Sequence, residues 1–374
     1  MKTPPPSIDR DSFLKPFLAL GFQPSEPGLL FPADLFIDLS GEELGKRLFL
    51  TSDGEGRDLC LRPELTIPVC IDHMAAGEPA RRADYVYFGR AFRLRTGRSG
   101  EFWQGGVEAI GATDRSVEDA RLLALAIDCA RRHGIAKPQL RLGDVGLFRS
   151  VLEALDLPAS WRRKLARDFG RSALIGTDLT QPAGPKRPIS THAGLMSALD
   201  RNDPEGARAL VADLLALGGL SPAGGRGVDD IAERFLERAE SRRAAISPPA
   251  DLDLLQRFLA IEGPPGDALM AARLVLAPLG VTVAGALDEF AARLEAIRNA
   301  GLALDEMIFS SAFGRRLDYY SGLVFELHVA AGRREPPLIG GGRYDRLFTL
   351  LGAPVPVPAI GFSLYVERLG EDAP

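Results

Sequence analysis

A long antiparallel hairpin is predicted for residues 84–111, whose sequence is DYVYFGRAFRLRTGRSGEFWQGGVEAIG. Its two arms, DYVYFGRAF and EFWQGGVEAIG, carry β-branched or aromatic residues at near-alternate positions, a pattern typical of β-strands. The segment RLRTGRSG between them is rich in glycine and arginine and suits a connecting loop. We therefore expect a hairpin with a basic tip.

Segments on both sides of this hairpin predict further strands and helices. Residues 11–20 form a short amphipathic helix that contains Pro16, and a helix capped by Ser116 follows the hairpin. Strand character is found in the segments 58–66 (DLCLRPELT), 139–142, 321–329 (SGLVFELHV) and 357–366 (VPAIGFSLYV). Both ends of the chain therefore mix strands with helices.

Residues 146–300 differ in character from the rest of the chain. They are rich in Ala, Leu, Arg and Glu at helical spacing, in segments such as PEGARALVADLLAL and LDEFAARLEAIRNAGL, and loops of Pro and Gly separate these segments. A mainly helical block is therefore inserted between two strand-rich blocks, 1–145 and 301–374. This order favours an α+β fold, with an antiparallel sheet flanked by helices, over a series of βαβ units.

Length and composition are those of a globular protein with about two to three domains. The chain has 374 residues, of which 46% are hydrophobic and 25% charged. No apolar run approaches the ~18 residues of a membrane span, and the first residues, MKTPPPSIDR, lack the core of a signal peptide. Three cysteines are too few for a disulfide scaffold. We expect a cytoplasmic protein that does not contact a membrane.

The sequence contains no motif for a metal, a cofactor or a nucleophilic catalyst. The four histidines form no HExxH pair, and neither CxxC nor GxSxG is present. The formal net charge of −5 argues against a protein whose whole surface grips nucleic acid. We therefore expect no metal site, no cofactor and no catalytic residue.

Two groups of polar residues are candidates for a binding site. Glu64 and Thr66 are two positions apart and would share one face of an extended segment, where they could hold an ammonium or imidazole group. The alternative is a solvated strand face. In the hairpin, Arg93 shares a strand face with Arg95, and Gln104 shares one with Glu108. If both faces meet in a cleft, they would bind a polar ligand; otherwise they form charge pairs on an exposed sheet.

Two further segments carry possible ligand contacts. Residues 315–329, RRLDYYSGLVFELHV, place Tyr319 and Tyr320 at the entrance to a strand, which suits a ligand pocket. The alternative is one core tyrosine beside a surface one. The run IGGGRYD at 339–345 is similar to a phosphate loop but lacks the GxxxxGK[ST] and GxGxxG spacings, so that a tight turn is the alternative.

Taken in order, these segments resemble a known family. LRPELT, FR…GRSGEFWQGGVEAIG, RRLDYYSGLVFE, GGGRYD and PAIGFSLYVERL are similar to the catalytic core of histidyl-tRNA synthetases, which are class II synthetases. The resemblance covers residues 10–145 and 305 to the end. It implies a six-stranded antiparallel sheet flanked by helices, in a homodimer. The family's histidine-binding positions correspond here to Glu64, Thr66, Arg93, Gln104, Glu108, Arg315, Tyr319 and Tyr320.

The departures from the family lie on the ATP and tRNA side. Arg368 matches the arginine that normally sits under ATP, but Arg95 replaces a carboxylate, and Arg316 and Tyr365 each replace a glycine. The glycine at the position of Tyr365 usually lets ATP approach. The loop RLRTGRSG is shorter than expected, and the chain ends six residues after Arg368. We therefore expect that the anticodon-binding domain is absent and that tRNA is not a partner.

A synthetase core that keeps amino-acid recognition without tRNA reading resembles the regulatory subunits of short-form ATP phosphoribosyltransferases. This resemblance implies a non-catalytic subunit, a homodimer within a hetero-oligomer, which activates a separate catalytic chain and takes part in feedback inhibition by histidine. Two alternatives stay open at this point. One is a histidine-adenylating ligase or truncated synthetase paralogue, supported by Arg93, Arg315 and Arg368; the other is a scaffold with a relic pocket.

Overall fold

The computed structural model describes residues 8–40, 42–169, 213, 251–315, 317–329 and 336–369. Arg316 and much of the predicted helical insertion, including PEGARALVADLLAL at 204–217 except for Asp213, lie outside these described residues. The described residues form two compact units, one from residues 1–151 and 257–374 and the other from residues 152–256. The first unit contains all the predicted site residues that are described below.

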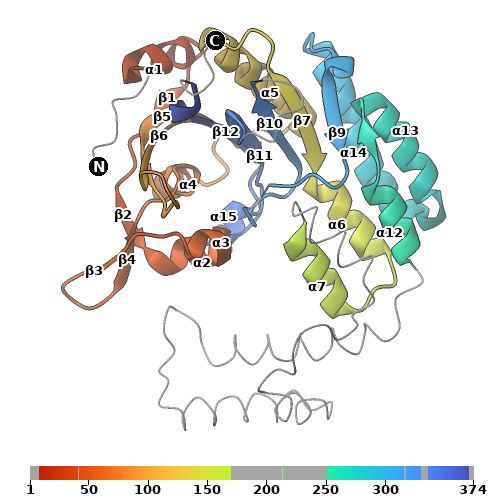
Figure 1. The fold of residues 1–374 in the computed structure, drawn as a ribbon, viewed down its shortest axis with the longest axis horizontal. Helices are drawn as coiled ribbons and strands as arrows, with labels where there is room; N and C mark the ends of the chain where they lie inside the picture. Colours follow the sequence, from red (N-terminus) through yellow and green to blue (C-terminus); the bar gives the residue numbers. More distant parts are fainter. Residues whose placement is uncertain are drawn as a thin grey trace. The chain divides into compact units, whose positions relative to one another are not determined.

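A nine-stranded sheet runs through the first unit in the order β1-β5-β6-β12-β11-β10-β7-β9-β8 (Figure 1). The six strands from β5 to β7 in this order pair antiparallel throughout, as the resemblance implies. β1 and β9 add parallel pairs at the two sides. The strands are β1 (Gln23–Pro24), β5 (Ala83–Phe92), β6 (Glu101–Ile110), β7 (Gln139–Asp144), β8 (Glu262–Gly263), β9 (Met307–Ser310), β10 (Leu323–His328), β11 (Ile339–Arg343) and β12 (Ala359–Tyr365).

The predicted hairpin is confirmed as β5 and β6, which pair antiparallel from Ala83 opposite Ile110 to Phe92 opposite Glu101. The connecting loop therefore comprises residues 93–100. β12 pairs with the free side of β6, and β11 pairs with β12. The hairpin is thus joined directly to the C-terminal strands, which brings the two strand-rich blocks of the sequence into one sheet.

The segment DLCLRPELT is only partly a strand. β4 (Asp58–Leu61) pairs with β2 (Leu30–Pro32) and β3 (Leu50–Ser52) in a small second sheet, and helix α4 (Thr66–Ala75) begins five residues later. The extended conformation expected for Glu64 and Thr66 is therefore wrong. The physical reason is local, because Pro63 has no N–H for a strand ladder and the Glu64 carboxylate accepts the first free N–H groups of α4, from Thr66 at 2.7 Å and Ile67 at 2.8 Å.

Helix α5 (Arg115–Arg132) packs across β10, β11 and β12 and covers one face of the sheet. Its N-cap is Asp114, whose carboxylate accepts from the Val117 N–H at 3.1 Å, and not Ser116 as predicted. Asp114 is the residue with the extended backbone that a cap requires. The short N-terminal helix is α1 (Arg10–Ala19), which contains Pro16 as expected.

Helix α14 (Val281–Asn299) packs along α5 and helix α13 (Pro265–Leu276) packs on α14 and β9 (Figure 1). Both helices therefore belong to the same compact unit as the sheet, so that this unit resumes at residue 257 and the predicted boundary at 300 differs from it. A buried ionic contact fixes this arrangement: Arg293 of α14 donates to Asp119 of α5 at 2.8 Å and also pairs with Asp144. Arg343 of β11 donates to Asp119 at 2.6 Å.

The remaining helices among the described residues are short. They are α2 (Ala33–Ser40), α3 (Glu42–Gly45), α6 (Val145–Ala154), α7 (Ala159–Asp168), α12 (Leu252–Leu259) and α15 (Leu347–Leu350), with the 3-10 turns η1 (Ala277–Leu279), η2 (Leu304–Glu306) and η3 (Val366–Leu369). In the part of the chain that the structure describes, no helix has the length and apolar character needed to cross a bilayer.

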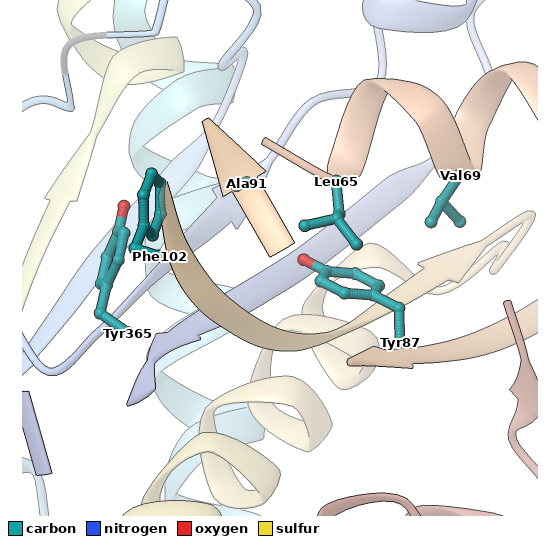
Figure 2. Packing of buried hydrophobic residues seen from close by; sticks show 6 residues of the cluster. All are labelled: Leu65, Val69, Tyr87, Ala91, Phe102 and Tyr365. Atoms are coloured by element: carbon teal, nitrogen blue, oxygen red, sulfur yellow. The ribbon is translucent and has the colours of Figure 1, made fainter. Parts of the chain in front are cut away.

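The second face of the sheet is covered near β5 and β6 by the start of α4. The side chains of the cluster are Leu65, Val69, Tyr87, Ala91, Phe102 and Tyr365 (Figure 2). Leu65 and Val69 come from the α4 segment, and the other four residues lie on three adjacent strands. This apolar cluster holds the α4 segment, and with it Glu64 and Thr66, against the sheet.

Candidate functional site

A pocket lies on this second face of the sheet, next to the start of α4. All eight predicted site residues line it, namely Glu64, Thr66, Arg93, Gln104, Glu108, Arg315, Tyr319 and Tyr320. Leu317, Gly340, Tyr344, Gly361, Phe362, Ser363 and Tyr365 also line the pocket, although the sequence analysis did not include them among the site residues. The space left for water in the pocket is about 10 Å³, roughly that of one water molecule. The pocket is therefore narrow and largely filled by its own side chains.

Glycines in β11 and β12 make room for the polar side chains of this pocket. Gly361 is paired with both Glu108 and Gly342, and a Cβ atom at Gly361 would overlap the Glu108 carboxylate. A Cβ atom at Gly340 would overlap the Arg315 guanidinium, and one at Gly342 would lie 2.9 Å from the Tyr320 ring. The tight turn considered for IGGGRYD is therefore wrong, because these glycines lie in a strand and are crossed by side chains from elsewhere.

Glu108 is the most deeply buried carboxylate of the pocket, with 0% of the residue exposed. Its Oε1 accepts hydrogen bonds from the hydroxyls of Thr66 at 2.7 Å and Tyr87 at 3.2 Å, and its Oε2 accepts one from Tyr344. The pKa of Glu108 is raised to about 8, mainly by burial and to a smaller extent by the nearby charge of Glu64. The hydrogen bonds from the three hydroxyls oppose this effect and lower the pKa. Since no cation pairs with it among the described residues, Glu108 is suited to a cationic group of a ligand.

Glu64 is buried as well, with 1% of the residue exposed, so the solvated strand face considered for it is wrong. Burial raises its pKa, although the N–H groups of Ile67 and Thr66 and the charge of Arg93 oppose this effect. Thr66 bonds to Glu108 through its hydroxyl and to Glu64 through its N–H. One residue therefore connects the two buried carboxylates, which face the same small space.

Gln104 follows the same face of β6 as Glu108, as predicted, and is also buried rather than on an exposed sheet surface. Its side-chain amide donates to the Ser363 hydroxyl at 2.6 Å, and that hydroxyl lies 2.8 Å from the hydroxyl of Tyr87. The Gln104 Oε1 atom is buried with no hydrogen-bond partner among the described residues. Because buried acceptors are rarely left unpaired, this oxygen is a point of attachment for a donor on a ligand.

Tyr319 and Tyr320 are both buried, so the interpretation of one core and one surface tyrosine is wrong. Their rings lie 4.8 Å apart, and the ring of Tyr319 meets that of Tyr344 edge to face at 5.8 Å. Burial raises the pKa of Tyr320 to about 12, with the nearby Arg315 opposing the effect, so this hydroxyl stays protonated. The tyrosines thus form an aromatic wall with neutral hydroxyls.

Two arginines supply positive charge to the pocket. Arg315 pairs with Glu326 of β10 at 2.8 Å, and its Nε atom is buried without a hydrogen-bond partner among the described residues. The Nε of Arg93 donates to the Pro63 carbonyl at 2.6 Å. Arginine groups in this position can bind a carboxylate, while the two glutamates can bind ammonium or imidazole groups. The arrangement is therefore complementary to an amino acid with a basic side chain.

Arg93 and Arg95 do not lie on a strand, contrary to the prediction. The strand ends at Phe92, so Arg95 lies in the loop, where its guanidinium pairs with Glu367 and its Nε donates to the Ser99 carbonyl at 2.8 Å. Arg95 is not among the residues that line the pocket. The like-charged replacement noted in the sequence is balanced by Glu367.

Tyr344, Tyr87 and Ser363 are functional candidates that the sequence analysis missed. Tyr344 belongs to the segment GGGRYD, in which only the glycines were considered. Ser363 could have been found from the alternation of Gly361, Ser363 and Tyr365 on one face of β12. Tyr87 had no comparable signal, because its contact with Glu108 depends on the register of β5 and β6.

Metal binding is not suggested by the described side chains, since no group of three or more His, Cys, Asp or Glu residues among them could hold an ion. The three cysteines are buried and unpaired. Burial raises the pKa of Cys129 to about 12, so this thiol is protonated and unreactive.

The chain is similar to proteins of known families. The family model described as histidyl-tRNA synthetase matches residues 9–201 and 236–369. A protein of Brucella canis named ATP phosphoribosyltransferase regulatory subunit is 42% identical over 91% of this chain and 90% of its own length. A protein of the same name from Mesorhizobium japonicum is 41% identical over 95% of this chain and 94% of its own length.

Solved structures show the same fold. An ATP phosphoribosyltransferase regulatory subunit/histidyl-tRNA synthetase from Bacillus halodurans is similar with a TM-score of 0.62 and 21% identity, over 96% of this chain and 76% of that chain. A histidine–tRNA ligase subunit from Alicyclobacillus acidocaldarius has a TM-score of 0.60 and 24% identity, over 99% of this chain and 96% of that chain. The class II synthetase-like α+β fold expected from the sequence is confirmed.

Proposed function

The chain belongs to the histidyl-tRNA synthetase family and, within it, to the ATP phosphoribosyltransferase regulatory subunits, and from this we propose that it regulates a short-form ATP phosphoribosyltransferase without catalysing a reaction itself. In this proposal it activates the separate catalytic subunit in the cytoplasm, as a homodimer within a hetero-oligomer. It also takes part in feedback inhibition by histidine in the first step of histidine biosynthesis.

The observation that carries this proposal is the convergence of the eight predicted residues on one enclosed pocket. Glu64, Thr66, Gln104 and Glu108 supply acceptors for the ammonium and imidazole groups of histidine, and Arg93 and Arg315 supply donors for its carboxylate. Tyr319 and Tyr320 complete the wall. Each of these side chains is polar or charged and buried or partly buried, which is costly for a structure unless a ligand makes use of it.

The narrowness of the pocket supports a regulatory role. Side chains fill most of it and leave room for about one water molecule between them. In this proposal the side chains rearrange when histidine enters, so that the bound and unbound states differ in structure. A ligand shifts an equilibrium between two states by its difference in affinity for them, and a difference of ~1–3 kcal/mol would give ~5–150-fold control.

The proposal is tested by co-expression with a short-form catalytic chain. We expect the two chains to purify together, the catalytic activity to depend on this chain, and histidine to inhibit the complex. Glu64→Ala and Gln104→Ala are expected to weaken histidine binding in calorimetry and to reduce inhibition. Glu262→Ala removes an exposed carboxylate from β8 and serves as the matched control, with wild-type behaviour. An absence of any complex would refute the proposal.

The alternative of a histidine-adenylating enzyme rests on Arg93, Arg315 and Arg368, which match positions of the synthetases. It predicts pyrophosphate exchange into ATP that depends on histidine. We expect no exchange above the level without histidine. Clear exchange that is lost in Arg93→Ala would overturn the regulatory assignment and favour the enzyme.

A further inference from the structure

Gly106, in the middle of β6, leaves an opening over which side chains from neighbouring strands meet. It is paired with Tyr87 of β5 on one side (Figure 2) and with Ser363 of β12 on the other. A Cβ atom at Gly106 would overlap the Tyr87 hydroxyl. Because that atom is missing, the hydroxyls of Tyr87 and Ser363 lie 2.8 Å apart across β6.

Gln104 and Glu108 extend this contact into a chain of hydrogen bonds. They lie two residues before and two residues after Gly106, on the same face of β6. The Gln104 amide donates to the Ser363 hydroxyl at 2.6 Å, and the Tyr87 hydroxyl donates to the Glu108 carboxylate at 3.2 Å. All four side chains are buried, so bulk water has little access to these bonds.

An ionised Glu108 determines where each hydrogen of the chain points. A carboxylate only accepts hydrogen bonds, and a bond to it is stronger than one between neutral groups, so Tyr87 gives it its single hydrogen. The Tyr87 oxygen then accepts the single hydrogen of Ser363, and the Ser363 oxygen accepts from the Gln104 NH₂ group. The atom of Gln104 that this order leaves over is Oε1, which is buried without a hydrogen-bond partner among the described residues.

We propose that Ser363 is a positioning residue that passes the direction set by an ionised Glu108 on to Gln104 and thereby turns the Gln104 carbonyl oxygen toward the ligand. This inference rests on the proposed function, in which a cationic group of histidine lies against Glu108 and keeps it ionised. The negative charge of Glu108 and the acceptor at Gln104 are then formed together. The pocket therefore favours a ligand that brings two donor groups at once, as the ammonium and imidazole groups of histidine do.

A purely structural role for the Ser363 hydroxyl is the competing explanation, since the residue is 7% exposed and lies within β12. The loss of a structural hydroxyl would weaken histidine binding independently of Gln104, so the two effects would add. A positioning residue acts through Gln104. Its loss should therefore have no further effect on binding once the Gln104 amide has been removed.

The test is calorimetric titration of the full chain with histidine, in the wild-type protein, Ser363→Ala, Gln104→Ala and the double variant. We expect Ser363→Ala to weaken histidine binding by about five- to tenfold, as for the loss of one hydrogen bond. The double variant should bind histidine as weakly as Gln104→Ala, within about twofold. Ser363→Thr keeps the hydroxyl and should recover most of the loss.

Ser310→Ala is the matched control. Ser310 is also a buried serine in a strand of the same sheet, with 3% of the residue exposed, but it does not line the pocket. This variant should bind histidine as the wild-type protein does. If circular dichroism shows that Ser363→Ala does not fold, Tyr87→Phe breaks the chain at its next bond, and the effect of Gln104→Ala on binding should then be smaller in Tyr87→Phe than in the wild-type protein.

Two results would overturn the inference: a Ser363→Ala variant that binds histidine as tightly as the wild-type protein, or an effect of Ser363→Ala that adds in full to that of Gln104→Ala. Either result, together with histidine binding by the wild-type protein, refutes the role of Ser363 and leaves the proposed function standing. The absence of histidine binding by the wild-type protein would refute the proposed ligand, and the role of Ser363 with it.

Discussion

Replacement of Glu108 by glutamine provides a direct test of the electrostatics of the pocket. Glu108 is fully buried, without a cationic partner among the described residues, and burial raises its pKa to about 8 from an ordinary value of 4.5. Around neutral pH the carboxyl is therefore mostly protonated. Like the glutamine amide, it then has a donor group and a carbonyl acceptor and carries no charge. We expect Glu108→Gln to fold as well as the wild-type protein at pH 6.

The magnitude follows from the difference in pKa between the folded and unfolded states. The raised pKa means that the folded protein holds this proton more tightly, so the contribution to stability is complete below pH 4.5 and is lost as the pH rises to about 8. Each pH unit in this window corresponds to ~1.4 kcal/mol. When the pH is raised from 6 to 9, the ionisation of Glu108 should therefore lower the free energy of unfolding of the wild-type protein by ~3 kcal/mol. The Glu108→Gln variant should not show this loss.

The assay is urea denaturation of both proteins at pH 6, 7, 8 and 9. The matched control is Glu326→Gln, since burial alone would raise the pKa of Glu326 but the Arg315 charge and His328 outweigh it and lower the pKa. The stability that Glu326 contributes is present above its ordinary pKa and is lost only as the pH falls through the lowered value. Its replacement should therefore cause no trend between pH 6 and 9. A difference between wild type and Glu108→Gln that does not change with pH would refute the reasoning.

Three further predictions concern the sheet and the pocket. Asp119→Ala leaves the buried guanidinium groups of Arg293 and Arg343 without their shared carboxylate and should lower the free energy of unfolding by ~3–5 kcal/mol in urea denaturation. The control Asp288→Ala breaks an exposed ion pair with Arg273 and should change the free energy of unfolding by less than ~0.5 kcal/mol. Gly361→Ala places a Cβ atom against the Glu108 carboxylate, so it should lower the free energy of unfolding by ~1–3 kcal/mol and abolish histidine binding in calorimetry. In the control Gly285→Ala the new Cβ has no atom within 4 Å, and the free energy of unfolding should rise by ~0.5–1 kcal/mol. Calorimetric titrations with histidine near pH 7, in buffers of different ionisation enthalpy, should show almost no net proton release, because the proton of Glu108 passes to the imidazole. Release of about one proton per histidine would show that the ammonium group lies against Glu108 instead.

The hairpin and the C-terminal strands could be predicted from the sequence because their side chains alternate over many residues. β5 and β6 each have ten residues, and their pairing follows from the short loop between them. The start of α4 could not be predicted in the same way. There, Pro63 and the cap formed by Glu64 override the apparent strand pattern, and this depends on a side chain that accepts backbone N–H groups.

The pocket was predicted as a set of residues but not as a geometry. The resemblance identified Glu108, but its three hydroxyl donors come from Thr66, Tyr87 and Tyr344, which are far apart in the sequence. They meet only because the strands pair in one register, so that neither residue spacing nor composition could reveal the raised pKa. The position of Arg95 was wrong for a related reason, because the strand ends before it and Glu367 attracts it.

The properties of Glu108 provide a physical source for the regulatory effect that we propose. In the pocket its carboxyl can ionise at pH 7 only at a cost of ~1.4 kcal/mol, because its pKa is raised to about 8. In the proposed function, a cationic group of histidine placed against the carboxyl would remove this cost. A term of this size lies within the ~1–3 kcal/mol typical of allosteric control.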